Sequence, residues 1–310
     1  MDLRSLEKAE LHVHLEGAAA PETLCEIVPG LTPEEARLRS RFSNFGEFLQ
    51  AFKWVHSCLR RPEHFALVLR RLLEQLEAEG VRYVEVNLSA GVILWRGLPL
   101  DEFFLAVAEE AERSALPVRF VFDAVRQFGV DHVQATAEAA VRWRSRGVAG
   151  FGIGGDEARG PARLYREAFE YVRAHGLAAV PHGGETTGPE SVWEALECGA
   201  RRIGHGIRAI EDPALVEELR KRGVALEICI TSNVRTGAVR CLEEHPVRRL
   251  FEAGVPLTLN TDDPAMFGTT LVREYELARD VFGFSEEELR QLAQNSFRYA
   301  LAAPPELCPV

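Results

Sequence analysis

The sequence predicts an α/β fold, a (β/α)₈ TIM barrel with a helical insertion after the first strand. Two observations predict it. Short apolar runs that suit strands alternate with segments of helical periodicity along the 310 residues. Polar motifs rich in histidine and carboxylates fall where several of these runs end, and active sites of such barrels lie at the C-terminal ends of the strands. We therefore expect one barrel domain over residues 1–310.

The apolar runs give eight candidate strands. They are Ala9–Leu15, Val81–Leu88, Val118–Ala124, Val148–Ile153, Ala178–His182, Arg202–His205, Val224–Ile230 and Val255–Asn260. Glycines that follow a helical pattern and directly precede a strand predict where helices end. These are Gly80, Gly147, Gly176, Gly223 and Gly254.

Amphipathic stretches between the strands predict the outer helices of the barrel. Examples are Glu63–Glu79, Leu100–Ser114, Asp131–Arg146, Pro161–His175 and Pro213–Arg222. Residues 21–59 do not fit the alternation, so we interpret Pro21–Leu59 as a mostly helical insertion that could serve as a lid. The segment Ser285–Ala302 predicts a closing helix, with Ser285 as its N-cap and Glu288 at the capping-box position.

Composition narrows the class of protein. A net charge of −11 argues against nonspecific binding to nucleic acid or anionic membranes. No apolar run approaches the roughly 20 residues of a membrane span, and the charged N-terminus gives no sign of a signal peptide. The six cysteines form no CxxC pair, so we expect them to be reduced and mostly buried in a cytoplasmic protein.

His12 and His14 lie two residues apart on the first predicted strand. Because side chains alternate along a strand, both imidazoles point to one face, here the barrel interior. Two imidazoles at this spacing can bind one cation, although a pair of hydrogen-bonded core histidines would give the same pattern. The remaining motifs favour a pair of metal ligands.

Histidines also end the fifth and sixth predicted strands. His182 ends strand five, and Glu185 follows across two glycines that permit a tight turn back over the site. We predict that His182 is a third imidazole ligand and that Glu185 transfers protons. His205 lies between two glycines, and its residue type leaves three roles open: a further ligand, a base or a stabiliser of charge.

Asp262 and Asp263 close the eighth strand. Neighbouring side chains on a strand end point in different directions, so one carboxylate can bind metal while the other meets substrate; Asp263 before a proline is also typical of a turn. Three histidines and one carboxylate fit one Zn²⁺, or another first-row divalent metal, with a position left for water. The segment Gly152–Glu157 contains no lysine to bridge two metals, and its glycines indicate backbone contact with a flat ligand.

The motifs occur in the order found in the adenosine deaminase family, and the resemblance covers nearly the whole chain. The matching segments are Glu10–Gly17, His182–Glu185, Ile203–Gly206, Ser232–Asn233 with Thr236–Gly237, and Asn260–Pro264. Five ordered matches are far more specific than any single motif. The HxE…PCxxC signature of cytidine-type zinc deaminases is absent.

The resemblance implies a role for each residue. The zinc ligands would be His12, His14, His182 and Asp262. Glu185 would protonate the purine nitrogen N1, and His205 would orient the attacking water, whose pKa the metal lowers toward about 7. Asp263 would bond N7, and the backbone N–H of Gly155 would meet N3. Glu16 and His14 would also contact the substrate, and ammonia would leave as the 6-oxo purine forms.

Glu16 leaves the substrate open. Adenosine deaminases usually carry Asp here, bonded to the ribose 5′-hydroxyl, whereas Glu is typical of adenine deaminases. The segments Ser232–Val239 and Pro264–Gly268 are more similar to the nucleoside branch. A third branch acts on 5′-modified adenosines such as aminodeoxyfutalosine, whose carboxylate could pair with an arginine. The candidates are Arg60, Arg61, Arg96 and Arg235. We expect an adenosine-type nucleoside, with aminodeoxyfutalosine and adenine as alternatives.

Two other classes of function use the same scaffold. An amidohydrolase that cleaves a cyclic amide or a phosphoester is one, but the single-metal pattern and Glu185 argue against it. A binding protein without turnover is the other, but every expected catalytic residue is present. The expected partner is a small-molecule purine, with no nucleic acid or membrane, and the sequence does not fix the oligomeric state.

Overall fold

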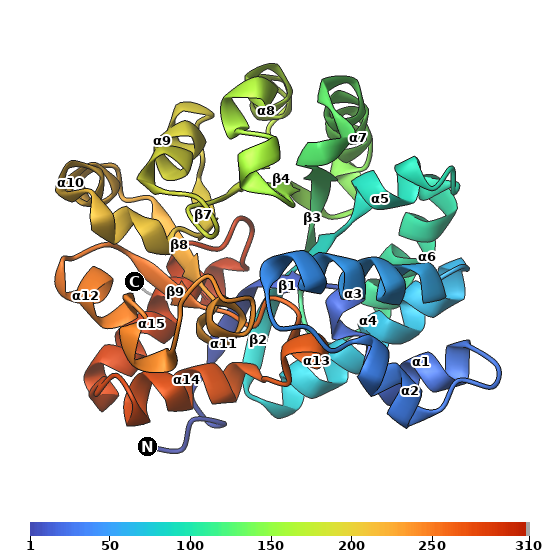
Figure 1. Ribbon diagram of the computed structural model, residues 1–310, viewed down its shortest axis with the longest axis horizontal. Coiled ribbons are helices and arrows are strands. Elements are labelled where there is room, and N and C mark those ends of the chain that lie inside the picture. Colours follow the sequence, from blue (N-terminus) through green and yellow to red (C-terminus); the bar gives the residue numbers. More distant parts are fainter. Residues whose placement is uncertain (308–310) are drawn as a thin grey trace.

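The computed structural model describes residues 1–307 as parallel strands surrounded by helices (Figure 1). The strands are β1 (Lys8–His14), β2 (Val81–Leu88), β3 (Val118–Val125), β4 (Val148–Gly154), β5 (Ala178–Ala179), β6 (His182–Gly183), β7 (Arg202–His205), β8 (Ala225–Ile228) and β9 (Leu257–Leu259). Every pairing between them is parallel. The predicted α/β barrel is confirmed.

The strands form two ribbons, β1 to β5 and β6 to β9. Between them, β5 and β6 are the two pieces of the strand predicted over Ala178–His182, interrupted at Pro181, which has no N–H for the ladder. At the other seam the Asp262 N–H donates to the His12 carbonyl at 2.9 Å, and the His14 N–H donates to the Asp262 carbonyl at 2.7 Å. This seam places Asp262 beside both histidines.

Helices cover the outside of the strands (Figure 1). They are α4 (Pro62–Ala78), α5 (Ala90–Trp95), α6 (Leu100–Arg113), α7 (Val130–Arg142), α8 (Arg166–Ala174), α9 (Pro189–Glu197), α10 (Pro213–Arg222), α11 (Ile230–Arg235), α12 (Val247–Glu252), α13 (Pro264–Phe267), α14 (Leu271–Asp280) and α15 (Glu286–Arg298). The strand predicted over Val224–Ile230 is shorter, as β8, because Ile230 begins α11. The strand predicted over Val255–Asn260 is likewise shorter, as β9.

The insertion after β1 contains three helices, α1 (Pro21–Ile27), α2 (Pro33–Arg39) and α3 (Phe45–Cys58). Figure 1 shows α3 passing in front of β1. The ring of Phe52 on α3 makes an edge contact with the ring of His14, with centroids 6.4 Å apart. The insertion therefore covers one side of the histidine cluster.

The predicted helix-ending glycines all have positive φ, between 64° and 99°, which a residue without a Cβ adopts readily. The closing helix begins with the expected Ser285–Glu288 capping box, but it ends at Arg298 and not at Ala302. Residues Tyr299–Ala302 leave the helix because their backbone groups bond to side chains inside the barrel.

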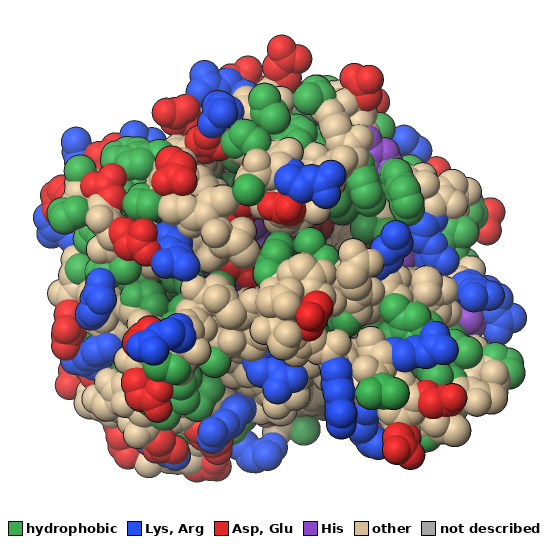
Figure 2. Space-filling model, viewed as in Figure 1, with side chains coloured by type: hydrophobic (Ala, Val, Ile, Leu, Met, Phe, Trp, Pro, Cys, Tyr) green, Lys and Arg blue, Asp and Glu red, His purple; other side chains and the backbone are tan. Residues whose placement is uncertain are grey.

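No disulfide forms among residues 1–307, and the cysteines there are free. Those that are buried are Cys58, Cys198 and Cys229, while Cys25 and Cys241 are partly exposed; Cys308 lies outside the described residues. No helix in the described part of the chain is long and apolar enough to cross a membrane. Acidic and basic side chains are interspersed over the face drawn in Figure 2.

Candidate metal centre and active site

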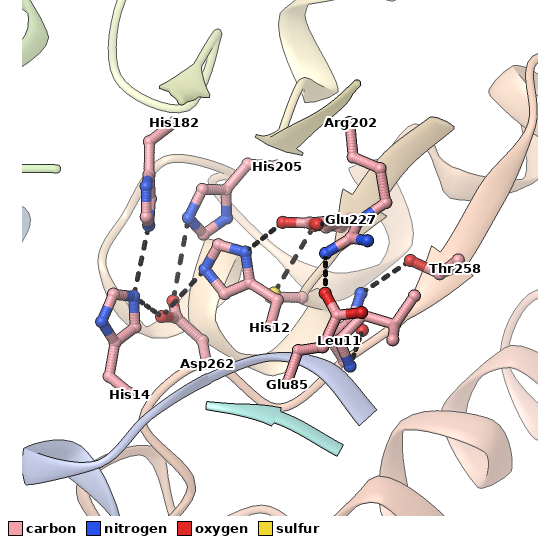
Figure 3. Close-up of polar contacts among 12 residues, drawn as sticks. Leu11, His12, His14, Glu85, His182, Arg202, His205, Glu227, Thr258 and Asp262 are labelled. Atoms are coloured by element: carbon pink, nitrogen blue, oxygen red, sulfur yellow. Dashed lines mark hydrogen bonds and ion pairs between the residues drawn. The ribbon is translucent and has the colours of Figure 1, made fainter. Parts of the chain in front are cut away.

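The structure brings together the four residues predicted to bind metal. His12 and His14 come from β1, His182 begins β6, and Asp262 follows β9. One ligand atom from each lies within 4.8 Å of the others, and all four residues are buried. His14 Nε2 is 3.2 Å from His182 Nε2 and 3.4 Å from Asp262 Oδ1 (Figure 3).

The chemistry of this donor set fits a divalent cation. Burial lowers the pKa of His14 to about 4 and that of His182 well below its usual value, so both imidazoles are neutral and have a free lone pair. His12 Nε2 is buried without a hydrogen-bond partner and lies 3.6 Å from Asp262 Oδ1. Although burial opposes it, the carboxylates of Asp262 and Glu227 raise the pKa of His12 well above its usual value, so this imidazole must release a proton to bind a cation. Three imidazoles and one carboxylate match a zinc site that leaves room for water.

Two residues of the site have a backbone conformation that residues other than glycine rarely adopt. Among residues 1–307, the non-glycine residues with positive φ are His205 (61°) and Asp262 (64°). This left-handed conformation costs about 1 kcal/mol or more and persists where surrounding contacts enforce it. The Ser232 hydroxyl donates to Asp262 Oδ2 at 2.6 Å, which leaves Oδ1 facing His12 and His14.

His205 is held by a chain of hydrogen bonds that defines its tautomer. The Val247 N–H donates to His245 Nδ1, so His245 carries its proton on Nε2, which lies 3.1 Å from Asn233 Oδ1. The Asn233 amide nitrogen then donates to His205 Nδ1 at 3.0 Å. Burial lowers the pKa of His205 to about 4, so the ring is neutral and its Nε2 carries the proton. That N–H lies 3.7 Å from Glu185 and 3.8 Å from Asp262.

Glu185 stands in a loop fixed by a second carboxylate, Glu157. Glu157 accepts hydrogen bonds from the backbone N–H groups of Gly184 (2.8 Å), Glu185 (2.9 Å) and Thr186 (2.9 Å). Burial raises the pKa of Glu185 well above its usual value, and the charges of Asp262 and Glu157 add to the effect. This shift favours the acid form of Glu185, beside the histidine cluster.

Asp263 is also a buried acid. Burial, together with the neighbouring Asp262, raises its pKa well above the usual value, and its Oδ1 has no hydrogen-bond partner. Gly17 lies against it, because a Cβ at Gly17 would come within 1.7 Å of Asp263 Oδ1. Gly155, with φ of 95°, lies beside Gln127, whose buried Oε1 is likewise without a partner.

Glu16 is fully buried just after β1. Its carboxylate accepts hydrogen bonds of 3.2 Å from both the backbone N–H and the hydroxyl of Ser89. His56 Nε2 of α3 lies 3.6 Å from Glu16, and Arg96 bonds to His56 Nδ1. Burial raises the pKa of Glu16 to about 7. Arg96 therefore has partners within the protein.

Several residues that support the site were not foreseen from the sequence. The buried group comprises Glu85, Arg126, Glu157, Arg202, Glu227 and His245. Three of them could have been noticed in the sequence, because each is a charged residue within a strand of the barrel. Strands of a parallel barrel are buried on both faces and normally form apolar runs. Glu85 in β2, Arg202 in β7 and Glu227 in β8 carry this signal, but no spacing identifies their partners.

Comparison with known proteins places this geometry in a family. The family model described as adenosine deaminase matches residues 7–306. An aminodeoxyfutalosine deaminase from Streptomyces avermitilis is 37% identical, with 95% of this chain and 86% of the relative covered. An adenine deaminase from Agrobacterium fabrum is 36% identical, with 95% and 94% covered.

A solved structure of an adenine deaminase has the same fold as this chain. The crystal structure of an adenine deaminase from Arthrobacter aurescens superposes with a TM-score of 0.90 at 28% identity, over 97% of this chain and 95% of that chain. The chain therefore belongs to the adenosine deaminase family, whose members are hydrolytic deaminases.

Proposed function

We propose that this enzyme removes the 6-amino group of an adenosine-type purine nucleoside by zinc-dependent hydrolysis, giving the 6-oxo product and ammonia. One observation carries the proposal: the cluster of His12, His14, His182 and Asp262 adjoins an uncharged His205 and a protonated Glu185. Bound zinc would supply a Lewis acid and a water whose pKa falls toward about 7.

The protein groups divide the proton transfers between them. Glu185 in its acid form donates to the ring nitrogen N1, which makes the neighbouring carbon C6 electrophilic. Asp263 in its acid form donates to N7 through a carboxyl group that has an unpartnered oxygen. His205 directs its Nε2–H toward the attacking oxygen, and the backbone N–H of Gly155 binds N3. Donors in these positions stabilise the charge that develops as the 6-amino group leaves.

A 5′-modified adenosine, aminodeoxyfutalosine, is the second candidate substrate. The 37% identical relative from Streptomyces avermitilis carries that name. The Glu16 carboxylate stands where the family resemblance implies a contact with the 5′ position, and it already accepts two hydrogen bonds from Ser89. Substrates that differ at the 5′ position should therefore be compared. Free adenine is the third candidate substrate, since the Agrobacterium relative is named adenine deaminase.

Ammonia release from adenosine, aminodeoxyfutalosine and adenine by the zinc-loaded protein tests the proposal. The expected result is release from a nucleoside at a higher kcat/KM than from adenine. The matched variant Glu185→Gln should retain zinc but lose about 10²–10⁴-fold in kcat, the usual contribution of proton transfer. A preference for adenine would reassign the substrate, and no release from any of them would exclude the activity.

We also propose that residues 21–59 act as a lid over the substrate. The contact between Phe52 and His14 supports this, because α3 reaches the metal cluster. Hydrogen exchange of α3 should slow when a non-hydrolysable nucleoside binds to the zinc-loaded protein. Unchanged exchange in α3 at saturating ligand would exclude the lid.

A further inference from the structure

A continuous set of buried charges runs from the metal cluster to the C-terminal segment. Glu227 Oε2 lies 2.6 Å from His12 Nδ1, and Arg202 donates from Nε to the other oxygen of Glu227. Arg202 also donates from Nη2 to Glu85 (Figure 3). All three charged side chains are at most 1% exposed.

The other end of this set is bonded to residues 299–302, which directly follow α15. The Tyr299 carbonyl accepts from Arg202 Nη1 at 2.7 Å, and the Leu301 N–H donates to Glu85 Oε1 at 2.5 Å. The Tyr83 hydroxyl donates to the same Glu85 oxygen and accepts from the Ala302 N–H. Hence both the guanidinium and the Glu85 carboxylate are oriented by backbone groups of residues 299–302.

These contacts explain why α15 ends where it does. The backbone groups of residues 299–302 satisfy hydrogen-bonding positions of Arg202 and Glu85 that their ion pair leaves open, namely Arg202 Nη1 and Glu85 Oε1. A buried ion pair is stable only when its remaining donors and acceptors are also bonded. The rigid fork of an arginine fixes the relative geometry of everything it binds. Because water cannot enter to compensate, a change at Glu85 must be taken up by Arg202 and Glu227.

We propose that residues 299–302 are a positioning element of the metal site, acting on His12 through Glu85, Arg202 and Glu227. The proposal rests on the zinc site described above. Glu227 orients the His12 ring, and Arg202 divides its charge between two carboxylates. In a Glu85→Gln variant, Arg202 would form an ion pair with Glu227 alone. Glu227 would then share more of its charge with Arg202 and support His12 as a ligand less strongly.

Zinc affinity of the full-length protein, measured by competition with a chromophoric chelator, tests this coupling. Groups that orient metal-binding histidines typically contribute about 10–100-fold to metal affinity. We expect Glu227→Gln to weaken zinc binding within this range and Glu85→Gln by about tenfold, at its lower end. The double variant should lose less than the product of the two single losses, because both act through Arg202.

A control separates metal coupling from general stability. Glu110 is a buried carboxylate paired with Arg70 and Arg113 on the outer helices. Glu110→Gln should lower Tm and leave zinc affinity unchanged. If Glu85→Gln does not fold, Tyr83→Phe removes one donor to Glu85 and the acceptor of Ala302, and it should weaken zinc binding in the same direction.

The outcomes are distinguishable from failure of the proposed activity. A wild-type protein that binds no zinc would overturn the metal site itself. Wild-type zinc binding together with unchanged affinity in Glu85→Gln, or in Tyr83→Phe where it is used, would overturn the coupling alone. Multiplicative losses in the double variant would also contradict a path through Arg202.

Discussion

The Glu157 carboxylate accepts a hydrogen bond from the backbone N–H of Glu185 at 2.9 Å. Although burial opposes ionisation, the charge of Arg126 and the bonds from Ser191, Thr186 and Thr187 hold the pKa of Glu157 below its usual value. The shift in Glu157 favours the ionised form that anchors the loop, while the shift in Glu185, on the same loop, favours the acid form.

Replacing Glu157 with Gln should lower kcat by about 10–100-fold, because an amide nitrogen would oppose the loop N–H donors and displace Glu185. Zinc content should not change. Steady-state kinetics with metal analysis checks this, with Glu190→Gln as an exposed carboxylate control in the same loop region. Equal kcat values for Glu157→Gln and the wild type would show that the loop does not depend on this anchor.

His14→Ala should abolish stoichiometric zinc binding. His14 supplies a buried nitrogen 3.2 Å from His182 Nε2 and 3.4 Å from Asp262 Oδ1. We expect a loss of affinity larger than the about 10–100-fold typical of residues that only orient a ligand. The measurement is zinc per chain after dialysis, with exposed His175→Ala as the control. One zinc per chain retained in His14→Ala would remove it from the ligand set.

Asn233→Leu keeps the approximate shape of the side chain but removes the donor to His205 Nδ1. The proton of His205 would no longer be fixed on Nε2, and kcat should fall by about 10²-fold while zinc remains bound. The matched control is Asn295→Leu. This substitution on α15 removes an amide that donates to the Leu257 carbonyl at the start of β9. An active Asn233→Leu enzyme would argue that the tautomer of His205 is set elsewhere.

His245 should make the metal-free protein less stable at acidic pH. Burial lowers the pKa of His245 from its usual 6.5 to about 3, so the unfolded chain takes up this proton first as the pH falls. The stability contributed by neutral His245 is present above pH 6.5 and is lost as the pH falls from 6.5 toward 3.

His245→Gln removes that titration. Between pH 6.5 and 5 the wild type should lose about 1.6 kcal/mol more unfolding free energy than the variant, because the slope approaches about 1.4 kcal/mol per pH unit only below pH 6.5. Urea denaturation of both metal-free proteins at the two pH values gives the difference. Parallel losses in wild type and variant would mean that His245 becomes protonated in the folded state.

The order of strands, the glycines that end helices and the four residues proposed as metal ligands all followed from local patterns. A strand has period two, so His12 and His14 had to share a face, and the strand ends of a parallel barrel meet at one rim. The extent of the last helix could not be predicted, because Tyr299 leaves it to bond with Arg202, a residue distant in sequence.

The sequence by itself determined the barrel, the four candidate metal ligands and the family resemblance, since each depends on residue type and local spacing. Only the tertiary structure decided which buried groups carry charge. Glu157 and Glu185 are the same residue type, yet the pKa of Glu157 is lowered and that of Glu185 raised, because both depend on burial and on partners such as Arg126 and Asp262. Arg126 follows β3 and Asp262 follows β9, and only the tertiary fold brings them close to these glutamates.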